Sequence, residues 1–156
     1  MTNQYIVVSL PKILIMDNLH TLGFFVDKAS IALSKALNAS FVAHNIDLSH
    51  SQFVLLKFLY YKEGLSQFEI ANLLSKDAAA IKRTIDELEK KNLVVRKQVR
   101  TLKNSISITD KGRNLLPQVF EIAQCIVDKA FNGIEKENQD LLQQMLNQIC
   151  INLESK

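Results

Sequence analysis

Positively charged residues gather in one part of this chain of 156 residues. Residues 75–115 contain eleven Lys or Arg against five Asp or Glu, a net charge of +6, whereas the whole chain carries +3 and the rest of it therefore −3. Ammonium and guanidinium groups bind phosphate oxygens, and a concentrated positive charge releases counterions from a polyanion. A contact with DNA is the chemistry that this segment favours. The alternative is a helix face with ordinary solvated lysines.

Two helices are expected to position the first of these charges. Ser66 followed by Glu69 is the pattern of a capping box, in which a hydroxyl and a carboxylate bind the free N–H groups at a helix start. After a turn at residues 75–77, apolar residues at helical spacing predict a longer helix from Ala78 to about Lys91. Its buried side carries Ile81, Ile85 and Leu88, and its other side carries Ala79, Ala80, Lys82, Arg83 and Glu87. Small and cationic residues in the first two turns suit close entry into a major groove.

A basic hairpin is expected after these helices. The residues at 94–99 and 105–109 favour extended strands, and residues 101–104 would form the turn between them. Cations lie on or near its tip, where a phosphate backbone could meet them: Arg96, Lys97, Arg100 and Lys103. Helices and hairpin together predict a winged helix-turn-helix. The residues expected to contact DNA are Gln67, Lys76, Ala79, Ala80, Lys82, Arg83, Arg96, Lys97, Arg100 and Lys103.

Short motifs from this unit resemble the MarR family of bacterial winged-helix repressors, in order and at near-matching spacing. They are Leu74, Asp77, Ile81-Lys82-Arg83, Ile85-Asp86, Leu88-Glu89, Leu93-Val94, Arg96 and Ile108-Thr109-Asp110-Lys111-Gly112. The resemblance implies that Arg83 is the recognition-helix arginine that contacts DNA and that Thr109 starts the next helix. It also implies flanking helices through which two copies pair.

Two features depart from the family pattern. The family's wing usually carries an Asp-x-Arg signature, which the segment Arg100-Thr101-Leu102-Lys103 lacks, and the wing also looks short. Arg100 and Lys103 are the candidates to replace the missing arginine. Ala79 and Ala80 stand where the family often has Ser or Thr, so base reading there would rest on apolar contact with thymine methyl groups.

Length and composition indicate one mainly α-helical chain. Only 4 Gly and 2 Pro occur, and 47% of the residues are hydrophobic, which is enough for a single core. We expect the winged helix, a three-helix core plus a β-hairpin, at residues 46–112. Helical dimerisation regions are expected at residues 1–45 and 113–156.

Apolar stripes at helical spacing run through both flanking regions. They comprise Leu22, Phe25, Val26, Ala29, Leu33, Ala36 and Leu37, then Leu116, Phe120, Ala123, Val127 and Ala130, and finally Leu142, Met145, Leu146, Ile149 and Leu153. A small winged domain offers these helices little to pack against, so pairing with a second copy would bury them. Intramolecular core is the alternative at any single position.

Residues 1–16 and the cysteines bear on location. The stretch Tyr5-Ile6-Val7-Val8 could be an arm over a partner subunit or an extension docked on its own chain. The apolar run at 6–16 is interrupted at Pro11-Lys12, is too short to span a bilayer and lacks a basic leader. Cys125 and Cys150 are expected in helices, packed as small hydrophobes. A cytoplasmic protein without membrane contact is therefore expected.

The resemblance also implies a small aromatic or lipophilic effector, bound between the dimerisation helices and the reading unit. Candidate pocket residues are His20, Phe24, Phe41, His44 and Tyr60, each of which could equally be core or surface. The histidines are too scattered for a metal site. No phosphate loop, nucleophile elbow or cofactor motif is present, and Asp77, Asp86 and Glu87 are explained by helix capping and solvation. Neither an enzyme nor a cofactor is expected.

The function predicted from the sequence is that of a DNA-binding transcriptional regulator. We expect a repressor that acts as a homodimer on a pseudo-palindromic operator in double-stranded DNA and that a small effector releases. The alternative is a winged helix that binds another protein and has no DNA role. Salt dependence separates the two, because a DNA binder loses affinity steeply as salt rises.

Overall fold

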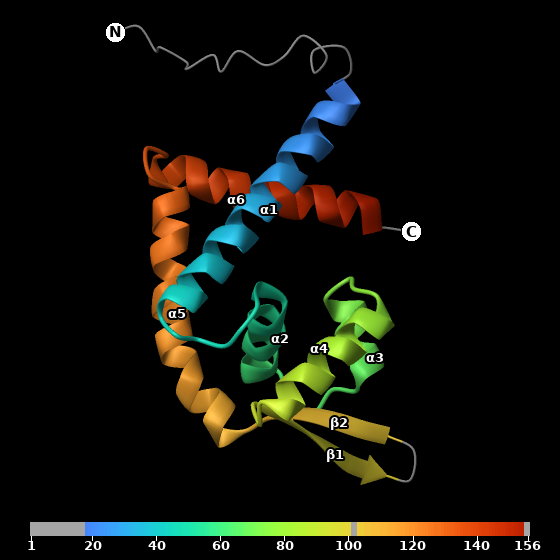
Figure 1. The fold of residues 1–156 in the computed structure, drawn as a ribbon. Helices are drawn as coiled ribbons and strands as arrows, with labels where there is room; N and C mark the ends of the chain where they lie inside the picture. The colour runs from blue at the N-terminus through green and yellow to red at the C-terminus, as the bar shows by residue number, and fades with distance from the viewer. Residues whose placement is uncertain (1–17, 101–102, 155–156) are drawn as a thin grey trace, which may run out of the picture.

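Helices make up most of the chain, and one two-stranded hairpin interrupts them (Figure 1). The computed structural model describes the backbone of residues 18–100 and 103–154 and the side chains of residues 22–97 and 105–154. The elements in order are α1 (Asn18–Ala43), α2 (His50–Tyr61), α3 (Gln67–Leu73), α4 (Ala78–Lys90), β1 (Val94–Arg100), β2 (Lys103–Ile108), α5 (Asp110–Ala130) and α6 (Lys136–Glu154). The mainly α architecture with a three-helix unit and a hairpin confirms the predicted fold class.

Short-range side-chain contacts start four of the helices. Ser49 and Gln52 form a capping box at α2, and Ser66 and Glu69 form the predicted one at α3. The Asp77 carboxylate accepts from the Ala80 amide, 2.9 Å away, at the start of α4. The Thr109 hydroxyl accepts from the Gly112 amide and starts α5, as predicted. Each cap satisfies backbone N–H groups that have no partner within the helix.

The hairpin is slightly longer than predicted. β1 and β2 are antiparallel, with Val94 opposite Ile108 and Arg100 opposite Lys103. Only residues 101–102, which lie outside the described part, therefore separate the strands, rather than residues 101–104. Leu65 forms an isolated antiparallel bridge with Ile106 and so adds one residue to this sheet.

The core joins the winged unit to the C-terminal half of α1 and to α5. The largest fully buried side chains come from these elements: Phe41, Leu55, Leu56, Leu59, Ile70, Ile85, Leu88, Ile106, Leu116 and Val119. Ring contacts run through this core from Phe41 to Phe53, from Phe53 to Phe120 and from Phe120 to Tyr60. Burial of this apolar surface holds the three helices and the hairpin in one fixed arrangement.

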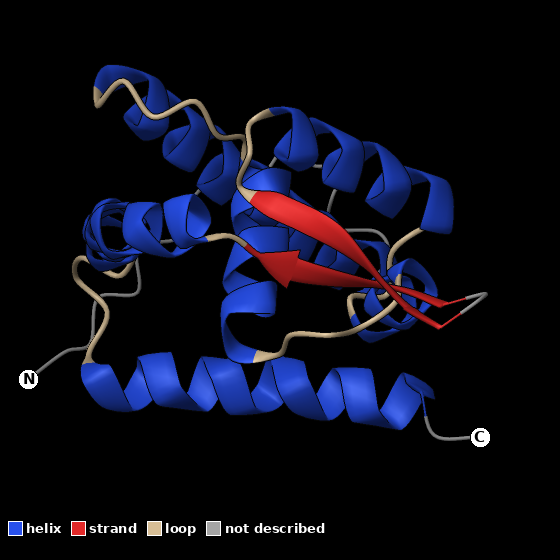
Figure 2. Ribbon diagram, turned by 90° about the horizontal axis from the view of Figure 1, so that it is seen from below, coloured by secondary structure: helices blue, strands red, loops and turns tan. Residues whose placement is uncertain are grey.

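The first half of α1 and the whole of α6 contribute little to that core. No residue of α6, all of which the structure describes, is buried, and Figure 2 shows α6 lying along one side of the molecule. In α1, Leu22, Phe24, Phe25 and Val26 are all exposed. The expectation that the winged unit offers the flanking helices little to pack against is therefore met for α6 and the first half of α1. It is wrong for Leu37 of α1 and Leu116 of α5, which are buried in the core of their own chain because these parts pack on the winged unit.

The prediction for the cysteines is wrong for the single chain. Cys125 and Cys150 do lie in helices, but both are exposed rather than packed as small hydrophobes. The reason is the arrangement just described, because α6 and the end of α5 face solvent. Among the described residues, no helix combines the length and apolar character needed to cross a membrane.

Candidate nucleic-acid interface

The second helix of the helix-turn-helix, α4, has one buried face and one free face. Ser75 lies in the turn before it with a φ of 48°, and Asn92 follows the C-cap residue Lys91 with a φ of 58°. After Asn92, the Leu93 amide donates to the Leu88 carbonyl oxygen, which satisfies an open group at the helix end. Its buried side chains are those predicted, Ile81, Ile85 and Leu88. This packing fixes which side chains face outward.

The outward face of α4 carries the cations that the sequence singled out. Ala79, Lys82 and Arg83 are exposed, and Ala80 is half-buried. Lys82 pairs with Asp86 one turn later, at 3.0 Å, whereas no ion pair among the described residues holds Arg83. A planar guanidinium on an exposed helix face can donate two parallel hydrogen bonds to a base edge or a phosphate.

Residues of neighbouring elements border this face. The Gln67 side chain donates to the Ala78 carbonyl oxygen, 3.2 Å away, and so ties α3 to the start of α4. Lys76 is exposed in the turn between the two helices, and Lys97 is exposed on β1. Arg100 and Lys103 face each other in the hairpin ladder, and their side chains lie outside the described part. The hairpin lies beside α4 in Figure 1.

Arg96 has protein partners that the sequence analysis missed. Its guanidinium pairs with Asp86 and Glu89 of α4, and its backbone N–H donates to Glu89. Hydrogen bonds from Lys82 and then from Arg96 hold the pKa of Asp86 below its ordinary value. Asp86 is therefore part of an ion-pair cluster, not only a solvated side chain as interpreted from the sequence. That Arg96 contacts DNA stays a prediction, because its guanidinium already clamps the hairpin to α4.

The candidate effector residues are spread along the molecule. Phe41 is fully buried, while Phe24 and Tyr60 are 43% and 40% exposed. Phe24 and Phe41 belong to the same helix, which places them about 25 Å apart along its axis. His44 is exposed and binds the Ser40 carbonyl oxygen, and the side chain of His20 lies outside the described part. Among the candidates whose side chains the structure describes, ring contacts link Phe41 to Tyr60, through Phe53 and Phe120.

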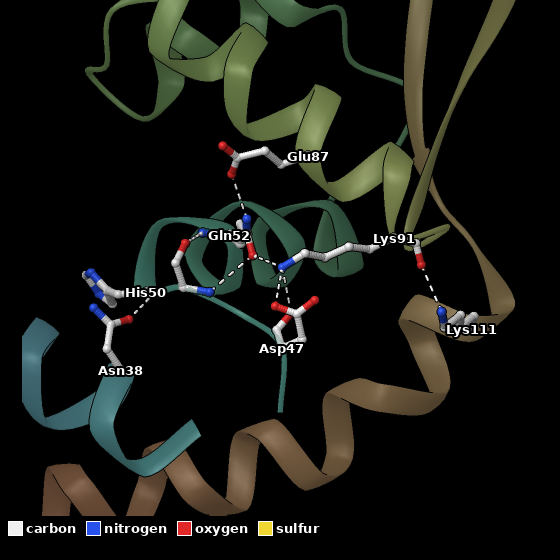
Figure 3. A network of polar contacts seen from close by, with 8 residues as sticks. Asn38, Asp47, His50, Gln52, Glu87, Lys91 and Lys111 are labelled. Atoms are coloured by element: carbon white, nitrogen blue, oxygen red, sulfur yellow. Dashed lines mark hydrogen bonds and ion pairs between the residues drawn. The ribbon is translucent and has the colours of Figure 1, made fainter. Parts of the chain in front are cut away.

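A polar junction lies behind α4, where it meets α2 and the segment that precedes α2 (Figure 3). Lys91, the residue that ends α4, donates to Asp47 and to Gln52. Gln52 also donates to Glu87, which is therefore not merely solvated. The sequence analysis missed this junction, because its members are far apart in the chain. The only signal was a Gln at the third position of a helix, where a capping box places it.

His50 joins the start of α2 to α1. Its backbone N–H donates to the Asn38 side chain at 2.7 Å, and its Nδ1 atom lies 2.9 Å from the Ser34 hydroxyl. Burial lowers the pKa of His50, and the positive charge of Lys76 lowers it further. Among the described residues, no group of three His, Cys, Asp or Glu could hold a metal ion.

A three-helix unit followed by a two-stranded wing, with exposed cations on α4, defines a winged helix-turn-helix protein. Residues 48–100 match the family model described as MarR family. The chain is similar to the HTH-type transcriptional regulator MhqR of Bacillus subtilis (strain 168), with 26% identity over 111 residues, which is 70% of this chain and 77% of that protein. These two matches agree with the resemblance stated above.

Two solved structures have the same fold. A transcriptional regulator of the MarR family from Rhodococcus sp. RHA1 has a TM-score of 0.76 and 23% identity, covering 86% of this chain and 96% of that one. The transcriptional repressor CouR, solved bound to a 23-mer DNA duplex, has a TM-score of 0.76 and 24% identity, covering 85% and 94%. Residues 48–100 therefore match the MarR family, and the relative and the solved structures to which the chain is similar are transcriptional regulators.

Proposed function

We propose that this protein is a sequence-specific DNA-binding repressor that acts as a homodimer on a pseudo-palindromic operator. The observation that carries the proposal is the outward face of α4, where Arg83 and Lys82 stand exposed beside small residues and next to a basic hairpin. The similar fold of CouR, a repressor solved with a DNA duplex, supports the same use of the unit. In the proposed complex α4 enters a major groove and the hairpin meets the flanking backbone.

Pairing of two chains is proposed to place the two α4 helices one helical turn of DNA apart. The exposed apolar residues of α1 and α6 support this, because a contiguous apolar surface is costly to leave in water. A two-fold axis would then place the two α4 helices on the two half-sites of a symmetric operator, whose centres lie about 34 Å apart. Residues 1–16, predicted to be an arm over a partner subunit or an extension docked on its own chain, lie outside the described residues.

We also propose that a small lipophilic or aromatic effector binds the protein and causes it to release DNA. The proposed location of the protein is the cytoplasm. Tyr60 is the candidate residue best placed to contact the effector, since its ring is partly exposed and contacts Tyr61, Phe120 and Arg113. An effector would act by binding one separation of the two α4 helices better than the other.

Selection of bound sequences from a random pool of DNA duplexes by the purified protein tests the proposal. Enrichment of an inverted repeat is expected, with affinity that falls steeply as salt rises. Arg83→Ala should weaken binding to the selected site by about 1–3 kcal/mol, if Arg83 pairs with a guanine. Lys136→Ala, which removes a cation from α6, is the matched control and should bind as the wild type does.

The hairpin is tested in the same assay. Arg100→Ala combined with Lys103→Ala should reduce the slope of affinity against salt by about 0.9 for each phosphate contact that is lost. An unaltered slope would place the hairpin away from the phosphate backbone. Absence of any enriched sequence, with binding that does not respond to salt, would favour a winged helix that binds protein instead.

A further inference from the structure

The side chain of Gln52 stands between two oppositely charged residues of α4 (Figure 3). Its Nε2 atom donates to the Glu87 carboxylate at 2.7 Å, and its Oε1 atom accepts from the Lys91 ammonium at 2.9 Å. Glu87 and Lys91 are one helical turn apart, a spacing at which such residues often pair directly. Here the amide of another helix lies between them and takes both contacts.

The amide can face only one way. Oε1 accepts a second hydrogen bond, from the Ser49 backbone N–H at 3.1 Å, as part of the capping box of α2. Turning the amide over would set its NH₂ group against an ammonium and its oxygen against a carboxylate. Gln52 is 5% exposed, so water cannot replace these contacts cheaply. The junction therefore holds α4 in one position along α2.

The start of α2 is in turn fixed to α1. The backbone N–H of His50 donates to Asn38, and the His50 ring contacts Ser34, both on α1. Lys91 also binds the backbone oxygen and the carboxylate of Asp47, just before α2. Hydrogen bonds from the first residues of α2 thus reach α1 on one side and, through Gln52, the end of α4 on the other. They connect the helix of the proposed dimer region to the helix that carries Arg83.

We propose that Gln52 is a positioning residue, which fixes α4 relative to α1 and thereby sets the half-site spacing that the dimer prefers. The inference rests on the proposed function and extends it. Gln52 does not contact DNA in this proposal. It acts through Glu87 and Lys91, which hold the reading helix at one distance from the two-fold axis.

The test compares affinities for two duplexes that differ only in half-site spacing: the selected site and the same site with one base pair inserted at its centre. Gln52→Glu keeps the acceptor for Lys91 but opposes the Glu87 carboxylate. We expect it to lower the ratio of the two affinities about tenfold, in the range of couplings between residues in contact. Adding Glu87→Gln restores a donor opposite the new carboxylate, and the double variant should recover most of the wild-type ratio.

Matched controls separate positioning from general damage. Gln118→Glu adds the same charge at an exposed position of α5 and should leave the ratio unchanged. Circular dichroism of each variant checks that it is folded. Lys91→Met removes the other side of the junction from a partly exposed position, so it tests the inference even if Gln52→Glu fails to fold, and it should lower the ratio too.

Each outcome has one meaning. A folded Gln52→Glu or Lys91→Met variant with the wild-type ratio would overturn the inference while the proposed function stands. The inference also fails if the double variant folds but does not recover the ratio. A wild-type protein that binds no duplex would overturn the proposed function itself, and that result is visible before any variant is made.

Discussion

Arg96 combines three contacts at the base of the hairpin. Its guanidinium reaches Asp86 and Glu89, two residues of α4 that are three positions apart and so share a face of the helix. Its own backbone N–H donates to Glu89, 3.1 Å away. The side chain is 26% exposed, so each ion pair is partly screened by water. The cluster therefore orients the hairpin against α4 more than it stabilises the whole fold.

Low pH should weaken the ion pairs of this cluster, because Asp86 becomes protonated. Hydrogen bonds from Lys82 first and Arg96 second hold the pKa of Asp86 below its ordinary value of 3.8. A carboxyl group whose folded pKa is lowered stabilises the fold at pH values above its unfolded pKa, and that contribution is lost as the pH falls through the folded pKa. The difference in Tm between the wild type and Asp86→Asn should therefore be largest near neutral pH and shrink below pH 3.8.

Thermal unfolding followed by circular dichroism between pH 7 and pH 3 measures that difference. In an Arg96→Ala background one of the two cations is gone, so the effect of Asp86→Asn should be smaller and change less with pH. A difference in Tm that stays constant over the whole range would show that the ionised carboxylate is not what the cluster uses.

Residues whose partners are near in sequence were predictable, and residues with distant partners were not. Ser66 and Thr109 bind amides three positions away, so their capping roles follow from the local pattern alone. Gln52 and Glu87 are 35 positions apart, and nothing local distinguishes their pairing from two solvated side chains. Arg96 lies closer to Glu89, but its choice of that partner depends on how the hairpin folds back on α4.

At the scale of elements, the hairpin and α5 pack against each other at Gly112 so closely that no side chain would fit there. A Cβ atom on Gly112 would overlap the Leu93 carbonyl oxygen and come within 2.8 Å of Cγ1 of Ile108. Gly112 lies in the first turn of α5, and its amide binds the Thr109 hydroxyl at 3.1 Å. The start of α5 is thus packed directly on the base of the hairpin, which a larger residue would push away.

Gly112→Ala should destabilise the protein by about 1–3 kcal/mol, as overpacking does, despite the better helix propensity of Ala. Gly23→Ala is the matched control: nothing lies within 4 Å of a Cβ at that position of α1. It should be neutral or stabilise by up to about 1 kcal/mol. The free energy of unfolding in urea measures both. Equal effects of the two substitutions would contradict the tight contact.

Element boundaries followed from the sequence where caps or turns mark them. The α4 helix was expected from Ala78 and begins there, because Asp77 caps it. The start of the hairpin turn was predicted correctly, but its end was placed two residues too late, since β propensity falls at polar residues such as Asn104 while the ladder continues through them. Pairing between strands, not the preference of one residue, decides where a strand ends.

At the scale of the whole molecule, apolar surface is concentrated on α1 and α6. The exposed residues of α6 include Leu141, Leu142, Met145 and Leu146. Leu142 and Leu146 are four positions apart and share one face. Periodicity predicted this stripe but could not say whether its own chain covers it. That depends on how far α6 lies from the core, which is a property of the complete fold.

Replacing Leu142 and Leu146 by Asp should convert a dimer to a single chain of 17.7 kDa and weaken DNA binding with it. Burying two carboxylates in an apolar interface is far more costly than exposing them on one chain. Light scattering coupled to gel filtration gives the mass. Asp at Gln144 and Asn147, which lie on the other side of α6, is the control with the same added charge and should keep the dimer. A wild type that is itself monomeric at all concentrations would refute the pairing.

Thr109 is the sole residue between the last strand and α5, and its hydroxyl binds both the Asn92 carbonyl oxygen and the α5 start. This short connection therefore fixes the start of α5 relative to the hairpin. One extra residue there would separate the contact of Thr109 with Asn92 from its contact with the start of α5. The same insertion within residues 131–135, between α5 and α6, would be taken up by the loop. An in-frame insertion should therefore be tolerated within residues 131–135, whereas an insertion next to Thr109 should abolish DNA binding.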